Sequence, residues 1–262
     1  MELQTLRTQI AQLASLVQGP FLISPAQQQE ELEILQKAAK HAGYFCFVVD
    51  MLKLKILSEH TFGVDKWLGY PNQDFTLETY IKSVHLIDQP FLFKFGKILM
   101  EQLLRSELPI GFMKGKFVVN HSIRDRNGKY YLMRRISQPF QLNAKKQVTE
   151  YINICTLVKA YNSEPFDATS AEVHDAVEAN IKAEVKANLS NLFPFTEKEL
   201  QLLQHYVAQP KSTRQAAADQ LHCSLESIKT YKERSLEKVE EKMEFRFDNY
   251  DDLVAFFAPY LG

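Results

Sequence analysis

The chain has 262 residues, 31 Lys and Arg, 32 Asp and Glu, and a formal net charge of −1. Domains usually hold about 100 to 200 residues, so this length suggests two of them. No stretch approaches the roughly 20 consecutive apolar residues that cross a bilayer, and the first residues lack the basic start and cleavage site of a secretion signal. Cys46, Cys155 and Cys223 lie far apart in no metal-binding spacing. We therefore expect a cytoplasmic protein with reduced thiols and no bound metal.

Charge is unevenly distributed along the chain. Residues 41–160 carry 17 basic and 10 acidic side chains, whereas residues 191–262 carry 9 basic and 12 acidic ones. The basic part of the chain is therefore not its C-terminal part.

Residues 1–40 are predicted to form N-terminal helices. Leu3, Leu6, Ile10 and Leu13 follow the alternating three- and four-residue spacing of a heptad seam, which favours pairing between two chains. The seam is too short to demand a coiled coil, so packing on the helix's own domain explains it equally well. A second helical pattern covers residues 24–43 and is closed by Gly43.

From Tyr44 the pattern becomes that of β-strands. Short β-rich runs occur at 44–50 and 53–58, and longer ones at 114–125, 129–142 and 149–160. Asn127-Gly128 lies between the third and fourth runs, where the glycine can supply the positive φ of a tight hairpin turn. Mixed helical sequence separates the two groups of strands. This order predicts an α+β domain with an antiparallel sheet.

Three segments within residues 41–160 resemble PAS domains. Trp67 to Tyr70 resembles the LGY turn of that family, residues 81–88 its "HPDD" segment, and residues 117–137 its strand-turn-strand segment. Leu86 stands where the family usually has proline. The resemblance implies a sensory domain for a small molecule or a protein; no residue pattern fixes a flavin or a haem, so no cofactor is predicted.

His85 is the one residue in this region that suggests a cofactor, because a lone histidine ligates haem in some PAS domains. A histidine that hydrogen-bonds a local turn is the more common case. The chain also contains no Gly-rich phosphate loop, HExxH or GxSxG pattern. We therefore do not expect an enzyme.

Residues 161–190 are predicted to be a linker helix, starting at Asp167, Thr169 or Ser170. Apolar side chains then recur at every fourth position from Val173 to Leu189, which gives one apolar stripe on a charged rod. Such a stripe packs either on a neighbouring domain or on a second subunit.

Residues 191–262 show the pattern of a helix-turn-helix. Thr196 and Glu199 form a capping box that starts a helix, and Pro210 ends it. A short helix over residues 214–221 follows, with small alanines that permit close helix contact. A longer helix begins at Ser224 and carries Lys and Arg side chains. A short helix, a tight turn and a longer basic helix are the plan by which a helix enters the major groove.

Residues 195–245 resemble the LuxR/GerE family of DNA-binding modules, through Thr196, Glu199 and Leu203, residues 217–221, and the segment from Ser224 to Val239. The spacer near Pro210 is longer than usual. The resemblance implies that Lys229, Thr230 and Glu233 contact bases, and that Arg214, Ser227, Tyr231 and Lys232 lie near phosphates. The alternative for each charged residue is a solvated helix surface. Ile228 and Val239 should be core.

The acidic balance of this module predicts weak DNA binding by a single copy, since affinity depends on neutralised phosphates. Two copies joined in a dimer would compensate. Besides the N-terminal seam, the last helix offers Leu253, Phe256 and Phe257 as dimer contacts, although these residues could equally pack on the other three helices.

The sequence thus predicts a homodimeric transcription regulator that binds double-stranded DNA and is controlled by a PAS-like sensory domain. Two alternatives stay open: a protein-interaction module that uses both domains without DNA, and a sensor with bound haem or flavin.

Overall fold

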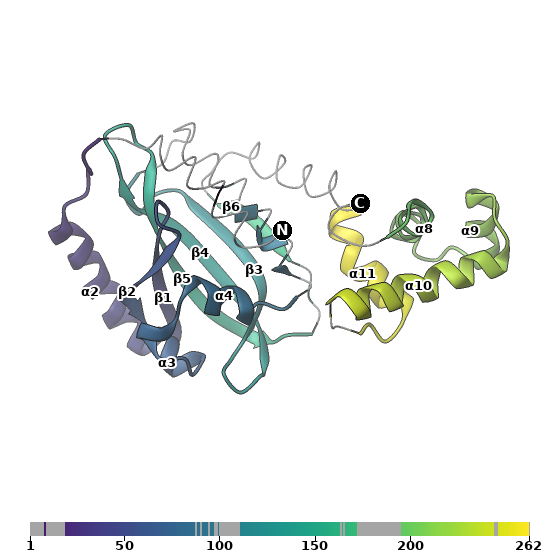
Figure 1. Ribbon diagram of the computed structural model, residues 1–262, viewed down its shortest axis with the longest axis horizontal. Coiled ribbons are helices and arrows are strands. Elements are labelled where there is room, and N and C mark those ends of the chain that lie inside the picture. The colour runs from purple at the N-terminus through teal and green to yellow at the C-terminus, as the bar shows by residue number, and fades with distance from the viewer. Residues whose placement is uncertain are drawn as a thin grey trace. The chain divides into compact units, whose positions relative to one another are not determined.

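The computed structural model describes residues 8, 19–86, 111–162, 166–171, 195–243 and 246–261, together with 88, 89, 91–93, 95, 96, 99 and 164. The chain divides into two compact units, Met1–Ala179 and Asn180–Gly262 (Figure 1). The predicted heptad seam of Leu3, Leu6, Ile10 and Leu13 and the apolar stripe beyond residue 171 lie outside the described residues. None of the helices that the structure describes is both long and apolar enough to cross a membrane.

The first unit is built on a six-stranded antiparallel sheet with the strand order β2-β1-β5-β4-β3-β6. Its strands are β1 (Tyr44–Asp50), β2 (Lys55–Phe62), β3 (Lys116–Arg124), β4 (Tyr130–Leu142), β5 (Val148–Ala160) and β6 (Asp167–Ala171). The first five correspond to the five predicted runs, which confirms the α+β prediction for this unit. β2 begins two residues later than predicted, because residues 51–54 form the turn after β1.

The β3–β4 hairpin has the predicted turn. Gly128 has φ +90°, the left-handed region that favours glycine. The Asp125 side chain closes the loop by accepting backbone N–H hydrogen bonds from Asn127 and Lys129, both at 2.9 Å. Local side-chain chemistry thus sets this turn and, with it, the register of the hairpin.

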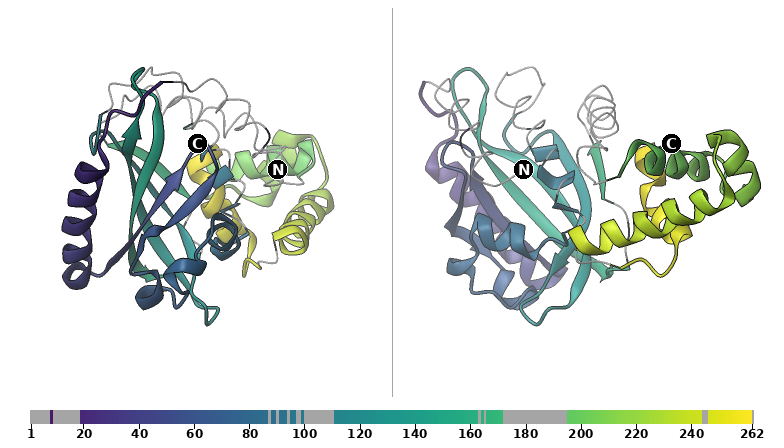
Figure 2. Two further views of the ribbon diagram at one scale, coloured as in Figure 1. Left: turned by 60° about the vertical axis from the view of Figure 1, so that its left-hand side comes forward. Right: turned by 45° about the vertical axis from the view of Figure 1, so that its right-hand side comes forward.

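Helices cover both faces of the sheet (Figure 2). On one face lies α2 (Pro25–Ala42), which begins at Ser24, whose hydroxyl accepts from the Gln27 backbone N–H, and ends at Gly43 in the left-handed conformation. Leu32 of α2 packs into a core cluster with Val48, Phe140 and Ile152. α2 is therefore part of the sheet's own core, and the predicted boundary at residue 40 does not separate it from the sheet.

The other face of β1 carries the residues that alternate with Val48. Phe47 packs edge-on against Phe75 and at a tilt against Tyr80, with ring centroids 5.6 and 5.3 Å apart. Tyr80 belongs to α4 (Leu77–Ser83), which follows α3 (Val64–Trp67) and the short 3-10 helix η1 (Asn72–Asp74). The period-two alternation of a strand thus gives β1 two buried faces.

The start of the predicted linker helix is wrong. Residues 167–171 form β6, which pairs antiparallel with β3 from Asn120↔Asp167 to Lys116↔Ala171. The Asn120 side-chain amide also donates to Asp167 Oδ2 at 3.1 Å. A strand forms here because the open edge of β3 offers backbone partners, and a local capping pattern cannot reveal such a distant partner.

The second unit consists of α8 (Glu197–Ala208), α9 (Arg214–Leu221), α10 (Leu225–Met243) and α11 (Tyr250–Leu261). Ile228 and Val239 are fully buried, as predicted. The order of a helix, a short helix and a longer helix agrees with the predicted helix-turn-helix.

Candidate functional site

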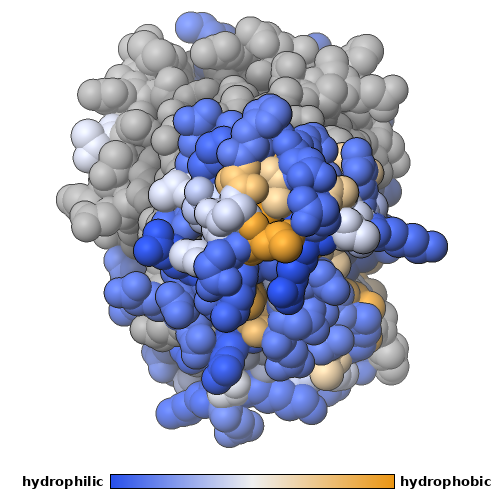
Figure 3. Space-filling view, turned by 90° about the vertical axis from the view of Figure 1, so that its right-hand side faces the viewer, coloured by the Kyte–Doolittle hydropathy of each residue, from blue (hydrophilic) through white to orange (hydrophobic). Residues whose placement is uncertain are grey.

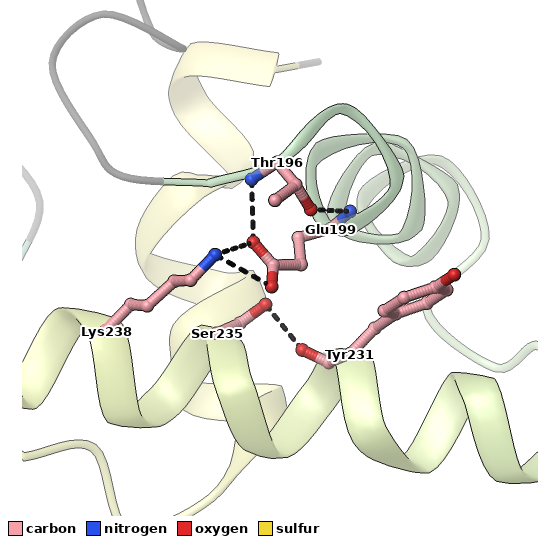
Figure 4. A network of polar contacts seen from close by, with 5 residues as sticks. All are labelled: Thr196, Glu199, Tyr231, Ser235 and Lys238. Atoms are coloured by element: carbon pink, nitrogen blue, oxygen red, sulfur yellow. Dashed lines mark hydrogen bonds and ion pairs between the residues drawn. The ribbon is translucent and has the colours of Figure 1, made fainter.

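The start of α8 is fixed by the predicted capping box. The Thr196 hydroxyl accepts from the Glu199 backbone N–H, and Glu199 Oε2 accepts from the Thr196 backbone N–H at 2.7 Å. The Glu199 carboxylate also pairs with Lys238 Nζ of α10, at 3.0 and 2.7 Å (Figure 4). One carboxylate therefore caps α8 and holds α10 against it.

A second polar contact joins α8 to α9. The buried His205 side chain lies between Gln220 Oε1, 2.7 Å from Nδ1, and the Ser212 hydroxyl, 2.7 Å from Nε2. Because an amide oxygen can only accept, Nδ1 donates to Gln220. This histidine thereby ties the loop after α8 and the end of α9 to one side chain, a role that the sequence analysis missed.

The turn between α9 and α10 is tight. Ala217 and Ala218 are almost fully buried, which is the close contact that their size predicted. His222 ends α9 in the left-handed conformation, with φ 51° and ψ 52°. Ser224 then begins α10, where its hydroxyl accepts from the Ser227 backbone N–H at 3.1 Å. His222 and Ser224 thus form the tight turn from α9 into α10.

Most predicted DNA contacts are exposed or half-buried. Arg214 is exposed at the start of α9. Lys229 and Glu233 are 52% and 58% exposed on α10 and form a loose ion pair of 3.9 Å. Figure 3 shows that the viewed side of the molecule is mostly hydrophilic around a small apolar area. These three side chains can therefore reach a charged partner.

Ser227, Thr230 and Tyr231 are half-buried on α10. The Ser227 hydroxyl lies 2.9 Å from that of Ser224, and the Thr230 hydroxyl donates to the Glu226 backbone oxygen at 3.0 Å. Both hydroxyls thus have partners at the start of α10. A phosphate oxygen can only accept, so a phosphate contact by Ser227 requires its hydroxyl to accept from Ser224 and donate to the phosphate, whereas Thr230 can accept from a base amino group.

Lys232, which is predicted to lie near a phosphate, contacts two aromatic rings. Its Nζ is 4.0 Å from the ring centroid of Tyr206 and 4.9 Å from that of Tyr250. Burial lowers the pKa of the half-buried ammonium. The two rings come from α8 and α11, and a cation over ring faces stabilises the packing of the helices. Lys232 thus contributes to the packing of these helices, and its phosphate contact stays a prediction.

The predicted dimer contacts of the last helix are buried within the single chain. Leu253, Phe256 and Phe257 are at most 2% exposed, and Phe257 packs edge-on against Phe195 at 5.5 Å. This burial favours the alternative interpretation, in which α11 packs on the other helices. A dimer through these three side chains would require them to leave the core.

The first unit contains a cavity of about 70 Å³ that is lined by the sheet, by α4 and by described residues between 92 and 99. Most of its lining is apolar. Polar groups come from α4, β4 and β5, and they are Tyr80, Arg135, Ser137 and Tyr151. None of them was singled out by the sequence analysis, because a cavity forms from elements that are distant in sequence.

Arg135 is the charged group of this cavity and is 6% exposed. Its Nη1 donates to the Tyr80 hydroxyl at 2.6 Å, and that hydroxyl lies 2.9 Å from His121 Nε2. His121 Nδ1 is 2.7 Å from the Ser122 backbone oxygen and donates to it. Burial and the Arg135 charge lower the pKa of His121 to about 3, so its ring is neutral.

His85 is not among the residues that line the cavity. Its ring packs against Tyr130 and Tyr161, with centroids 4.8 and 5.7 Å away. Its backbone N–H donates to the Ser122 hydroxyl, and its backbone oxygen accepts from Asp88. Burial lowers the pKa of His85 to about 4. The observed contacts agree with the local-turn interpretation. The described residues contain no group of three or more possible metal ligands.

No family model and no curated protein matches the chain. Solved structures similar to it include the N-terminal domain of a diguanylate cyclase with a PAS/PAC sensor from Marinobacter aquaeolei, at 13% identity and a TM-score of 0.34 over 44% of this chain and 95% of that one. Another is the phage VqmA-DPO complex, at 16% identity and a TM-score of 0.30 over 89% of this chain and 92% of that one. A third is the Vibrio cholerae VqmA dimer, at 10% identity and a TM-score of 0.28 over 87% of this chain and 86% of that one. Similarity at this level does not identify a function.

Proposed function

We propose that the chain is a sequence-specific DNA-binding transcription regulator, not an enzyme, that acts in the cytoplasm as a homodimer under the control of its PAS-like sensory unit. The observation that carries the proposal is the exposed Lys229 and Glu233 pair on α10, directly after the tight turn at His222. Lysine can donate to guanine acceptors, and glutamate can accept from cytosine N4.

The charge of the helical module supports the dimeric part of the proposal. With 9 basic and 12 acidic side chains in residues 191–262, one module neutralises few phosphates and binds non-specific DNA weakly. Two modules on one palindromic site gain from effective concentration without any new contact. In this proposal, segments other than the buried side chains of α11 form the contact between the two subunits.

Selection from a random duplex library at low salt, followed by gel shift, tests the proposal. We expect a palindromic site, and Lys229→Ala should weaken its binding by about 1 to 3 kcal/mol and relax specificity at one position of each half-site. The matched control is Arg246→Ala, which removes an exposed charge from the same module outside the helix-turn-helix. Failure to select any sequence at any salt concentration would favour the protein-interaction alternative.

A further inference from the structure

The cavity of the first unit contains a positive charge that has no negative partner among the described residues. Arg135 has one hydrogen bond, to Tyr80, and its Nε is buried with no hydrogen-bond partner. No carboxylate among the described residues forms an ion pair with it. A buried charge that lacks a partner costs several kcal/mol, because water no longer solvates it. Proteins usually avoid this cost, so the arrangement calls for an explanation.

None of the groups nearest the guanidinium carries a negative charge that would neutralise it. Tyr80 offers its hydroxyl and its ring, with the guanidinium 5.7 Å from the ring centroid. Burial raises the pKa of the Tyr80 and Tyr151 hydroxyls, and His121 is neutral. The cavity therefore keeps a net charge of one at neutral pH.

The other residues that line the cavity favour a small ligand with an apolar part. Leu77, Ile81, Leu92, Phe95 and Leu99 contribute hydrocarbon walls. A volume of about 70 Å³ is several times the space of roughly 10 to 15 Å³ that one water needs. It is suited to a few non-hydrogen atoms and not to a flavin or a haem.

We propose that this cavity binds a small monocarboxylate with a short hydrocarbon chain, whose carboxylate pairs with Arg135 and whose chain contacts the apolar walls. A carboxylate accepts two parallel N–H donors of a guanidinium, which would include the unpartnered Nε. The Tyr151 hydroxyl stands at the same cavity and can donate to one of its remaining lone pairs. The Ser137 hydroxyl already donates to Asn153 Oδ1 at 2.8 Å. The regulatory meaning of such a ligand rests on the proposed sensory function, whereas its binding does not.

Matched ligands test the charge requirement. Acetate, propionate and butyrate, each beside its primary amide, are titrated against the full chain in a carboxylate-free buffer by calorimetry and by thermal unfolding followed through Trp67, the only tryptophan. We expect at least one acid to bind and to raise the unfolding temperature, and its amide to bind at least tenfold more weakly. Equal affinity of acid and amide, or no binding of any acid, would overturn the proposal.

Arg135→Met removes the charge with little change in volume, and Arg134→Met does the same at the neighbouring exposed position. Arg135→Met should abolish acid binding and raise the unfolding temperature of the free protein, whereas Arg134→Met should bind as the wild type does. Acid binding that survives in Arg135→Met contradicts the assignment. If Arg135→Met fails to fold, the acid and amide series on the wild type decides alone.

The same titrations separate this proposal from the function proposed above. Acid binding without any selected DNA site would support the ligand site and contradict the proposed role as a transcription regulator. A selected DNA site without acid binding would do the reverse.

Discussion

The Glu199 carboxylate and the Lys238 ammonium form a bidentate contact, at 3.0 and 2.7 Å, that joins the first turn of α8 to the second half of α10. Glu199 is 2% exposed, whereas Lys238 keeps 29% of its side chain in solvent. The contact therefore holds the candidate reading helix against α8.

Removing one partner of this pair should destabilise the helical unit. Lys238→Met leaves the Glu199 carboxylate buried without its cation, and we expect a loss of about 1 to 3 kcal/mol, below the range for fully buried pairs because Lys238 is partly solvated. Denaturant unfolding followed by far-UV circular dichroism measures it. Lys229→Met, at an exposed position of the same helix, serves as the control and should change stability by less than about 0.5 kcal/mol.

The same pair predicts a loss of stability in acid. Burial alone would raise the pKa of Glu199, but the hydrogen bonds from Lys238 and Thr196 outweigh it and lower the pKa below its usual value. A lowered folded-state pKa gives stability that is present above the unfolded-state pKa and is lost as pH falls through the folded-state value. The helical unit should therefore weaken below about pH 4.5, and Glu199→Gln should flatten that dependence. If the Glu199→Gln variant loses stability in acid as steeply as the wild type does, the prediction is wrong.

Asp88 should produce the opposite slope in the first unit. Its Oδ2 accepts from the Ser122 backbone N–H at 2.7 Å, its Oδ1 has no partner, and burial raises its pKa to about 7. A raised folded-state pKa gives stability that is complete at low pH and is lost as pH rises towards 7.

Asp88→Asn keeps the acceptor and removes this titration. The buried His85 and His121, whose pKa values are lowered, act in the opposite direction, so the quantity to measure is the difference between variant and wild type. Followed by Trp67 fluorescence, Asp88→Asn should gain stability relative to the wild type between about pH 4 and 7. A difference that does not vary with pH would show that Asp88 does not titrate in this range.

Lys232 and Arg214 should separate stability from DNA binding. Lys232→Met loses the cation between Tyr206 and Tyr250 and should destabilise the module by about 0.5 to 2 kcal/mol, with no change in the salt dependence of DNA binding. Arg214→Met should leave stability unchanged and reduce the slope of log affinity against log salt by about one. If Lys232→Met also reduces the slope of log affinity against log salt, this lysine contacts a phosphate, as the sequence predicts.

His222 tests the turn before α10. The left-handed backbone conformation of His222 costs an L-residue about 1 to 2 kcal/mol. Glycine avoids this cost but loses more conformational entropy on folding, so the net gain in stability is smaller. His222→Gly should stabilise the module by about 0.5 kcal/mol, whereas His222→Ala should not. Thermal unfolding of the two variants side by side measures this, and equal effects would mean that the conformation at residue 222 is not strained.

The sequence by itself determined the features that depend on neighbours along the chain. Gly128 marks the hairpin because only a positive φ closes that turn, and Thr196 and Ser224 mark helix starts because their hydroxyls meet backbone N–H groups three residues on. Period-two and helical patterns likewise identified the first five strands and the helix-turn-helix.

Only the tertiary structure decided what depends on distant partners. Residues 167–171 form a strand because the edge of β3 is available to them, and Lys232 serves packing because rings from α8 and α11 meet over it. Arg135 is a strand residue in the sequence, and only the assembled unit makes it a buried cation with no ion-pair partner among the described residues. Burial and charge pairing are properties of the assembled core, so no local pattern contains them.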